Sequence, residues 1–174
     1  MLIRNAHAHD APAILKLIQA LAQYEKLLDE VVATEADIRS TLFSENPQAE
    51  VILAEEGGTL VGFALFFHNY SSFLARKGIH LEDLFVLPEH RGKGVGKKLL
   101  IHLAQLSRER RCGRLEWNVL DWNQSAIDFY KKMGATPLRN WFTFRLDSEG
   151  IDQFAPKDSP KEERLAPMSS PGLA

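Results

Sequence analysis

The sequence predicts an α/β (α+β) fold in which helices cover both faces of a mixed, mostly antiparallel sheet. Val51–Glu55 and Leu60–His68 are rich in β-forming residues and flank Glu56-Gly-Gly-Thr59, which is typical of a hairpin turn. Apolar residues at helical spacing lie before and after this hairpin, and one helix separates two strands. Such a strand–helix–strand crossover makes its two strands parallel neighbours, so the sheet is mixed.

The N-terminal part predicts one strand and two helices. Leu2–Arg4 has the pattern of a short strand, and in Asp10-Ala-Pro12 the Asp is a typical cap and the Pro a typical first-turn residue. Thr34-Glu-Ala-Asp37 resembles another N-cap, which opens a short helix to about Phe43. The first helix presents an apolar stripe that we expect to pack on the sheet: Ile14, Leu17, Ile18 and Leu21.

The second half predicts the rest of the sheet and a tail. Pro, Ser, Lys and Glu dominate from Pro156 onward, which predicts flexibility. We therefore expect one domain over 1–147 and a C-terminal tail over 148–174, flexible or packed on a partner subunit. The elements expected in between are a loop Asn69–Gly78, a strand Ile79–Val86, a helix Gly94–Arg110, a strand Arg114–Leu120, a helix Gln124–Met133 and a terminal strand near Trp141–Leu146.

The stretch Leu81–Leu100, in which an apolar strand leads into the glycine-rich segment Arg91-Gly-Lys-Gly-Val-Gly96 and a helix start, is the most informative part of the chain. Its glycines lack Cβ atoms, so backbone N–H groups can close on an oxyanion at the positive end of the following helix. That arrangement suits a pyrophosphate and predicts a nucleotide-like ligand or coenzyme A. The dinucleotide and P-loop glycine patterns do not fit, because Lys97 and Arg91 stand where they require glycine.

Composition restricts the class of protein. A chain of 174 residues is expected to make one domain and to bury roughly 70% of its unfolded surface. The net charge of −2 with local basic clusters argues against a nucleic-acid binder, and the six histidines show no metal-ligand spacing. One cysteine, Cys112, no signal-peptide pattern and no apolar run of about 20 residues predict a cytoplasmic protein without membrane contact.

Two motifs resemble those of the GNAT acetyltransferase superfamily. Arg91–Gly96 resembles its (R/Q)-x-x-G-x-(G/A) acyl-CoA signature, and Asn123–Ala135 resembles its distal N-x-x-x-x-x-(F/Y)-Y-x-x-x-G-(F/A) element. Ala22-Gln-Tyr-Glu25, Leu81-Glu-Asp83 and Trp122-Asn-Gln-Ser125 are similar to the diamine (spermidine/spermine) N-acetyltransferase branch. The resemblance covers about residues 2 to 147. It implies the GNAT fold with a splayed parallel strand pair, acetyl-CoA as donor and a homodimer, with Trp141–Leu146 as a swapped strand.

The resemblance also assigns coenzyme contacts. The pyrophosphate is expected on the main chain of the glycine-rich segment, and the pantetheine arm is expected beside the main chain of the preceding strand. Asn123 also has the side chain of an N-cap, and both roles can hold. The expected coenzyme-binding residues are Leu84, Phe85, Val86, Arg91, Gly92, Lys93, Gly94, Val95, Gly96, Lys97, Asn123, Gln124, Ser125 and Ala126.

Acetyl transfer to an amine needs a proton acceptor and a proton donor. An alkylamine with a pKa near 10.4 is disfavoured in its neutral form by about 4.6 kcal/mol at pH 7. Glu82 is the expected base, although it has a purely structural alternative in an ion pair with an arginine. Tyr130 is the expected general acid, because a phenol stays protonated at neutral pH. Its alternative is an aromatic core residue.

The acceptor is the least determined part of the prediction. Tyr24, Glu25, Glu82 and Asp83 are expected on the substrate side, where carboxylates can pair a second cationic group. Asp83 shares the site with Glu82 only if a bulge interrupts the strand, because neighbouring residues otherwise face opposite ways. Arg76 and Lys77 would repel a polyamine if they faced the site, which makes an amino acid with a side-chain amine a rival substrate.

The sequence therefore predicts an N-acetyltransferase that moves acetyl from acetyl-CoA directly to a primary amine of a diamine, polyamine or amino acid. No metal is expected. Two alternatives stay open. One is a non-catalytic acyl-CoA-binding or sensor domain, in which Glu82 and Tyr130 only pack. The other is a protein-directed acetyltransferase, which needs an open peptide groove.

Overall fold

A computed structural model describes residues 1–155 of the chain. Its contacts separate a compact unit, Met1–Ala135, from a second unit that begins at Thr136. The expected division at residue 147 stays a prediction, and the expected flexible tail from Pro156 lies outside the described residues. No helix in residues 1–155 is long and apolar enough to cross a membrane.

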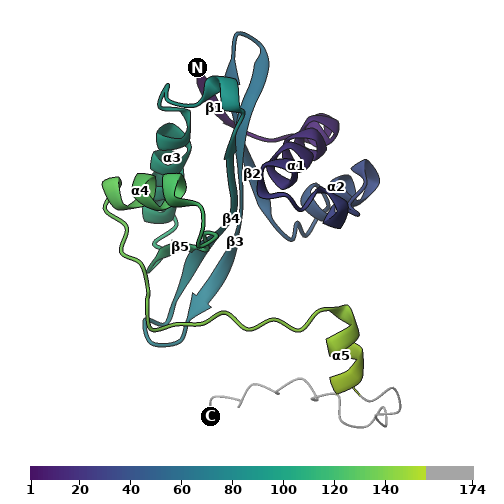
Figure 1. Ribbon diagram of the computed structural model, residues 1–174, viewed down its shortest axis with the longest axis vertical. Helices are drawn as coiled ribbons and strands as arrows, with labels where there is room; N and C mark the ends of the chain where they lie inside the picture. The colour runs from purple at the N-terminus through teal and green to yellow at the C-terminus, as the bar shows by residue number, and fades with distance from the viewer. Residues whose placement is uncertain (156–174) are drawn as a thin grey trace, which may run out of the picture. The chain divides into compact units, whose positions relative to one another are not determined.

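The first unit contains a five-stranded sheet in the order β1-β2-β3-β4-β5 (Figure 1). The first four strands pair antiparallel, and β4 and β5 pair parallel, which confirms the predicted mixed sheet. The crossover that joins this parallel pair is α3. The strands are β1 (Leu2–Asn5), β2 (Glu50–Glu56), β3 (Thr59–Ser71), β4 (Arg76–Val86) and β5 (Leu115–Trp117).

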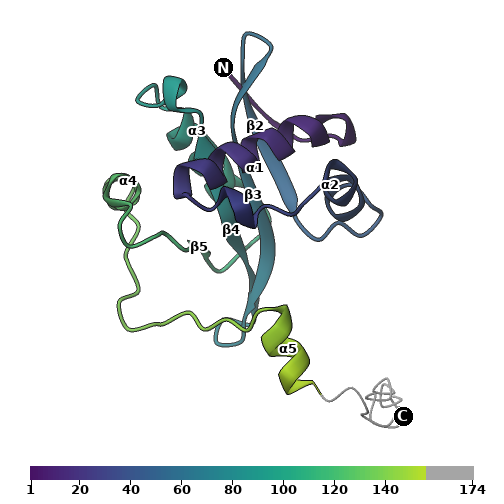
Figure 2. The same ribbon diagram turned by 45° about the vertical axis from the view of Figure 1, so that its right-hand side comes forward.

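Helices cover both faces of this sheet, as predicted (Figures 1 and 2). On one face, α1 (Ala11–Glu25) and α2 (Glu35–Leu42) bury Ile14 and Ile38 against β2 and β3. On the other face, the crossover helix α3 (Val95–Glu109) buries a second apolar cluster, and α4 (Gln124–Lys132) follows β5. This second cluster includes Phe66, Leu81, Val95, Leu99 and Leu103.

The two predicted helix starts differ in how they are held. Thr34 caps α2 as expected, because its hydroxyl accepts from the Asp37 N–H at 3.2 Å and the Asp37 carboxylate accepts from the Thr34 N–H at 2.8 Å. Asp10 precedes α1, but its carboxylate bonds no helix N–H group. It accepts hydrogen bonds from both terminal nitrogens of Arg4, at 2.8 and 2.9 Å, and one from the N–H of His7. Asp10 therefore ties α1 to β1.

We expect Asp10→Asn to lower the free energy of unfolding by about 1–3 kcal/mol at pH 7, because it weakens charge-assisted hydrogen bonds of a buried carboxylate. The Arg4 hydrogen bond lowers the pKa of Asp10 from 3.8 to about 2, so its stabilisation is complete above about pH 4 and is lost as the pH falls toward 2. Thermal unfolding between pH 2 and pH 7 measures both effects. Asp29→Asn, at an exposed position, is the control, and equal stability curves for the two variants contradict the prediction.

Three expected elements differ in the structure. Strands β3 and β4 extend through most of Asn69–Gly78, which was predicted as a loop, because the long hairpin continues its pairing to Ser71 and Arg76. No strand forms over Trp141–Leu146; a strand needs a neighbour for its N–H and C=O groups, and none of the strands within residues 1–155 pairs with this segment. A short helix, α5 (Ser148–Phe154), was missed; Asp147 caps it by accepting from the Gly150 N–H.

The paired strands β4 and β5 separate after Leu81 and Trp117. Their parallel register covers only Ile79 to Leu81 on β4, while β4 itself continues to Val86. The other edge of β4 stays paired with β3, where Leu65 lies opposite Asp83 and Phe66 lies opposite Leu81. Glu82 is therefore the extra residue of a β-bulge. The predicted splayed pair is confirmed, and it opens the sheet where the candidate residues gather.

Candidate active site

A cavity of about 550 Å³ opens in the first unit where β4 and β5 separate. Its volume is typical of a site for a small molecule or cofactor. The structure brings most of the predicted site residues to its wall and leaves Lys93 and Gln124 out. The predicted residues on the wall are Tyr24, Glu25, Glu82, Asp83, Leu84, Phe85, Val86, Arg91, Gly92, Gly94, Val95, Gly96, Lys97, Asn123, Ser125, Ala126 and Tyr130.

One end of the cavity is the glycine-rich segment before α3. Gly92 and Gly94 have positive φ angles of 75° and 81°, a conformation that glycine adopts without strain. A Cβ atom at either position would meet nothing within 4 Å. Among residues 1–155, no backbone N–H group from Gly92 to Lys97 donates a hydrogen bond to the protein. Six consecutive donors are therefore free to meet an anion at the start of a helix.

The middle of the cavity holds three carboxylates. The bulge at Glu82 places Asp83 on the face of β4 that also carries Phe85, toward α1, so both carboxylates line the cavity. The side chain of Glu82 is half exposed and lies 3.6 Å from the Nε2 of His80. Glu25 reaches the same cavity from the end of α1, and its burial raises its pKa.

Asp83 is the most perturbed of these acids. Burial raises its pKa from 3.8 to about 7, and the nearby negative charges of Glu82 and Glu25 act in the same direction. The carboxylate is therefore near half protonation at neutral pH. A group with this pKa exchanges protons readily at neutral pH, which is the property expected of a catalytic base. The strand alternation alone predicted Asp83 away from Glu82, and the bulge brings them together.

Tyr130 lies in the last turn of α4 and lines the cavity. Its ring packs against Trp117 of β5, with ring centres 4.8 Å apart, and against Phe129 at 5.2 Å. Burial, and to a lesser extent the charge of Glu25, raises the pKa of Tyr130 to about 12. The phenol thus stays protonated throughout the physiological range. Its packing is partly that of a core aromatic residue, yet its place on the cavity wall also suits a proton donor.

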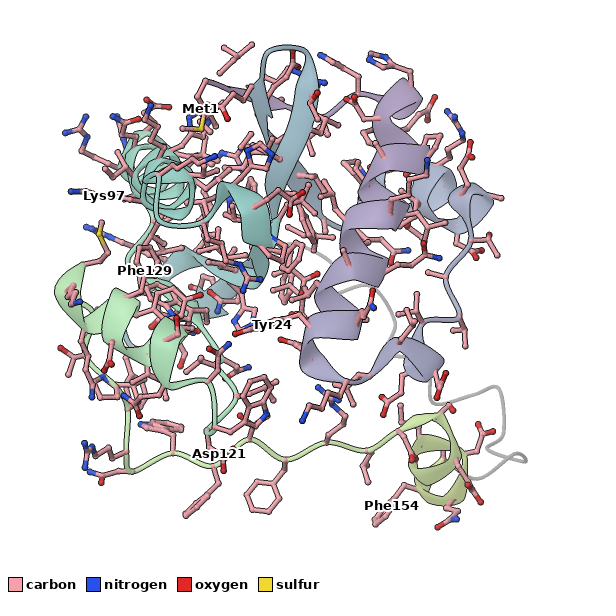
Figure 3. The ribbon with its side chains drawn as sticks, turned by 45° about the horizontal axis from the view of Figure 1, so that its top comes forward. Met1, Tyr24, Lys97, Asp121, Phe129 and Phe154 are labelled. Carbon is pink, nitrogen blue, oxygen red and sulfur yellow. The ribbon has the colours of Figure 1, made fainter. Side chains whose placement is uncertain are left out.

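Tyr24, labelled in Figure 3 near the end of α1, and Asn123 belong to different segments of the cavity wall and are joined by a hydrogen bond. The Tyr24 hydroxyl donates to Oδ1 of Asn123 at 3.3 Å, and the same oxygen accepts from the N–H of Ala126 at 3.2 Å. Asn123 therefore caps α4, as its residue type predicted. The hydroxyl of Tyr24, which the sequence predicted to contact the substrate, is thus hydrogen-bonded to the protein itself.

Several cavity residues were not predicted from the sequence. Trp117 and Asn118 stand where β5 ends, whereas the sequence placed both of them inside a longer expected strand, Arg114–Leu120. Phe129 precedes Tyr130 on α4 and also lines the cavity. His90 lies next to the glycine-rich segment, and its Nδ1 is 3.2 Å from a Glu56 carboxylate oxygen in the β2–β3 turn.

Arg76 and Lys77 do not line the cavity. They pair with Ser71 and Tyr70 at the far end of the β3–β4 hairpin, whereas the cavity surrounds the opposite end of β4. Their positive charge therefore does not oppose a polyamine at this site. The two cations therefore give no reason to prefer an amino acid over a polyamine as the substrate.

The chain belongs to the acetyltransferase (GNAT) family, whose sequence model matches residues 15–135, and it is an N-acetyltransferase of that family. The two motifs that suggested the superfamily lie within the matched residues. The resemblance to the diamine branch is also confirmed, because enzymes of that kind are among the curated relatives.

Three relatives show the breadth of the group. The chain is 38% identical to thialysine N-epsilon-acetyltransferase from Sus scrofa, over 90% of this chain and 98% of that one. It is 34% identical to an L-ornithine N5-acetyltransferase from Arabidopsis thaliana, over 86% of this chain and 85% of that one. It is 35% identical to a spermidine/spermine N(1)-acetyltransferase-like protein from Homo sapiens, over 86% of this chain but 23% of that longer one.

Solved structures agree with this assignment. An integron cassette protein from the mobile metagenome of V. cholerae superposes with a TM-score of 0.76 at 28% sequence identity. The match covers 88% of this chain and 96% of that one. The predicted fold class is therefore confirmed by the arrangement of the strands and by its structural neighbours.

Proposed function

We propose that the protein transfers acetyl from acetyl-CoA to a primary amine of a small molecule that carries a second cationic group. The observation that carries this proposal is one cavity whose wall carries both six free N–H donors before α3 and a cluster of carboxylates with a tyrosine. The first feature fits a pyrophosphate, and the second fits an amine. Family membership supplies the reaction class.

The donor half fits coenzyme A by its chemistry. The N–H groups of Gly92 to Lys97 would hold the pyrophosphate, and the absence of Cβ atoms at Gly92 and Gly94 leaves room for close approach. The edge of β4 that β5 leaves free, from Leu84 to Val86, would pair with the amides of the pantetheine arm. Acetyl-CoA supplies the thioester whose carbonyl carbon the amine attacks.

The protein moves two protons in this reaction. Asp83, assisted by the neighbouring Glu82, accepts a proton from the acceptor ammonium, so that a neutral nitrogen can form the new C–N bond. The C–S bond then breaks, and Tyr130 donates its phenolic proton to the departing thiolate. After its attack the nitrogen still carries one surplus proton; it releases that proton to solvent, and the tyrosinate regains one from solvent. The sequence predicted Glu82 alone as base; we assign the proton to Asp83, because burial and the charge of Glu82 raise its pKa to about 7.

The acceptor half favours a second cation. Glu25, Glu82 and Asp83 provide negative charge, and the basic residues on the described cavity wall, which include Arg91 and Lys97, stand with the glycine-rich segment. Thialysine, ornithine and spermidine, the compounds in the relatives' names, each carry more than one amino group. The free carboxylates would hold the amino group that is not acetylated.

The test measures thiol release from acetyl-CoA with 1,4-diaminobutane, ornithine, thialysine and spermidine, and with 1-aminobutane as the matched amine that lacks a second cation. We expect kcat/KM for the best diamino compound to exceed that for 1-aminobutane by about tenfold or more. Binding of acetyl-CoA without turnover of any amine favours the sensor domain instead. Preferred turnover of lysine-containing peptides favours a protein-directed enzyme.

The pH profile tests the base. The pKa of Asp83, about 7, predicts that kcat/KM falls as the pH drops through 7, because the acceptor amine is almost entirely ammonium at these pH values and only the ionised carboxylate can take its proton. Asp83→Asn should remove this fall of kcat/KM at low pH. Glu82→Gln shifts it to lower pH, because the charge of Glu82 raises the pKa of Asp83. An Asp83→Asn enzyme whose kcat/KM falls with pH as that of the wild type does would contradict the assignment of Asp83 as base.

We also propose a homodimer. Large apolar side chains of the segment 138–146 are exposed, among them Trp141, Phe142 and Phe144, at 77%, 84% and 93%. Their order, Trp-Phe-Thr-Phe-Arg-Leu, is typical of a strand, so pairing with a second copy would bury them. Light scattering should show a dimer at micromolar concentration, and Phe142→Asp with Phe144→Asp should give a monomer. A monomeric wild type contradicts this proposal.

A further inference from the structure

The side chain of Arg91 is held by the protein at the first residue of the glycine-rich segment. Its Nε donates to the carbonyl oxygen of Val86 at 2.8 Å. Its guanidinium carbon lies 4.4 Å from the centre of the Tyr24 ring and 5.3 Å from that of Phe85. A guanidinium over an aromatic face is attracted by the ring's electrons, so these contacts fix the start of the segment to β4 and α1.

Tyr24 makes a second contact, through its hydroxyl, with the start of α4. Its hydroxyl donates to Oδ1 of Asn123, which has two lone pairs and also accepts the N–H of Ala126. Asn123 starts α4, and Tyr130 projects from the same helix. The hydroxyl of Tyr24 therefore holds the end of α4 that sets the direction of the helix.

The ring of Tyr24 is itself confined. It packs between Phe85 and Trp122, with ring centres 6.5 and 6.0 Å away. The backbone turns directly after it, since α1 ends at Glu25 and Lys26 adopts a left-handed conformation with φ of 63°. Tyr24 thus connects three segments that are far apart in sequence: the end of α1, the glycine-rich segment and the start of α4.

We propose that Tyr24 is a positioning residue with two separable effects. Its ring positions Arg91 and thereby the N–H groups that bind acetyl-CoA, and its hydroxyl positions α4 and thereby Tyr130. This inference rests on the proposed function. It replaces the prediction that Tyr24 contacts the acceptor, and it gives the Arg91 side chain a structural task in place of direct phosphate binding.

Two substitutions separate the effects. Tyr24→Phe keeps the ring and removes the hydroxyl, so we expect kcat to fall by roughly three- to tenfold while the Kd for acetyl-CoA stays within about twofold. Tyr24→Leu also removes the ring, so the Kd for acetyl-CoA should rise by roughly three- to tenfold in addition. Calorimetry gives Kd, and steady-state kinetics give kcat. Wild-type values in both variants, or equal changes of Kd in both, overturn the inference.

Controls distinguish positioning from general loss of structure. Tyr70→Phe makes the same chemical change at an exposed position on the β3–β4 hairpin and should change neither quantity. Lower thermal stability in both Tyr24 variants, without the division between kcat and Kd, indicates a structural residue and overturns the inference. If the wild-type protein binds acetyl-CoA but acetylates no amine, only the proposed function fails. The Kd of Tyr24→Leu for acetyl-CoA then still tests whether the Tyr24 ring positions Arg91.

Discussion

Tyr130→Phe is expected to lower kcat by about 10²- to 10⁴-fold, the range that a positioned general acid contributes. The substitution removes only the phenolic oxygen and keeps the ring that packs between Trp117 and Phe129. The thiolate then has to leave without a proton from the enzyme. Steady-state rates with saturating acetyl-CoA and the best diamino acceptor measure the effect.

Acetyl-CoA binding is the control for this variant. Tyr130 is not among the groups proposed to hold the pyrophosphate, so calorimetry should give a Kd for acetyl-CoA within about twofold of wild type. A Tyr130→Phe enzyme with a kcat near that of wild type would leave the tyrosine as a packing residue. The proton for the thiolate would then have to come from water or another group.

Gly94→Ala is expected to raise the Kd for acetyl-CoA by on the order of ten- to a hundredfold, equal to about 1.4–2.8 kcal/mol. The new Cβ meets no protein atom within 4 Å, so it occupies the open space from which a ligand approaches the N–H groups. Gly94 also has a φ of 81°, which alanine tolerates at a cost of about 1–2 kcal/mol. Calorimetry and thermal unfolding separate these two effects.

Gly58→Ala is a closely matched control. Gly58 has the same φ of 81°, and a Cβ atom there would also meet nothing within 4 Å, but it lies in the turn between β2 and β3. Both variants should lose similar stability, and only Gly94→Ala should lose affinity for acetyl-CoA. Equal affinities in the two variants would contradict a role for the glycine-rich segment in binding.

The sequence predicted the parts of the site that local chemistry determines. Glycines at 92 and 94 are required by positive φ angles, and that requirement is visible in residue type alone. Asn123 and Thr34 cap helices by hydrogen bonds to residues three positions away, which is a local pattern too. The parallel pairing of β4 with β5 followed from the helix that connects them, because such a crossover makes its two strands parallel neighbours.

Other features depend on contacts that no local pattern encodes. The bulge at Glu82 is a property of the register between β3 and β4, so the sequence left the direction of Asp83 open. The contact between Tyr24 and Asn123 joins positions that are 99 residues apart. The strand expected over Trp141–Leu146 has strand-like residues, but a strand forms only with a partner, and residue type does not supply one.

Titration calorimetry with acetyl-CoA and with S-acetylpantetheine tests the central claim most directly. The two compounds share the thioester and the pantetheine arm, and the second lacks the pyrophosphate that the N–H groups of Gly92 to Lys97 are proposed to hold. We predict that the wild-type protein binds acetyl-CoA at least about a hundredfold more tightly than S-acetylpantetheine. Equal affinity for the two compounds, or no binding of acetyl-CoA by the folded protein, would contradict the account.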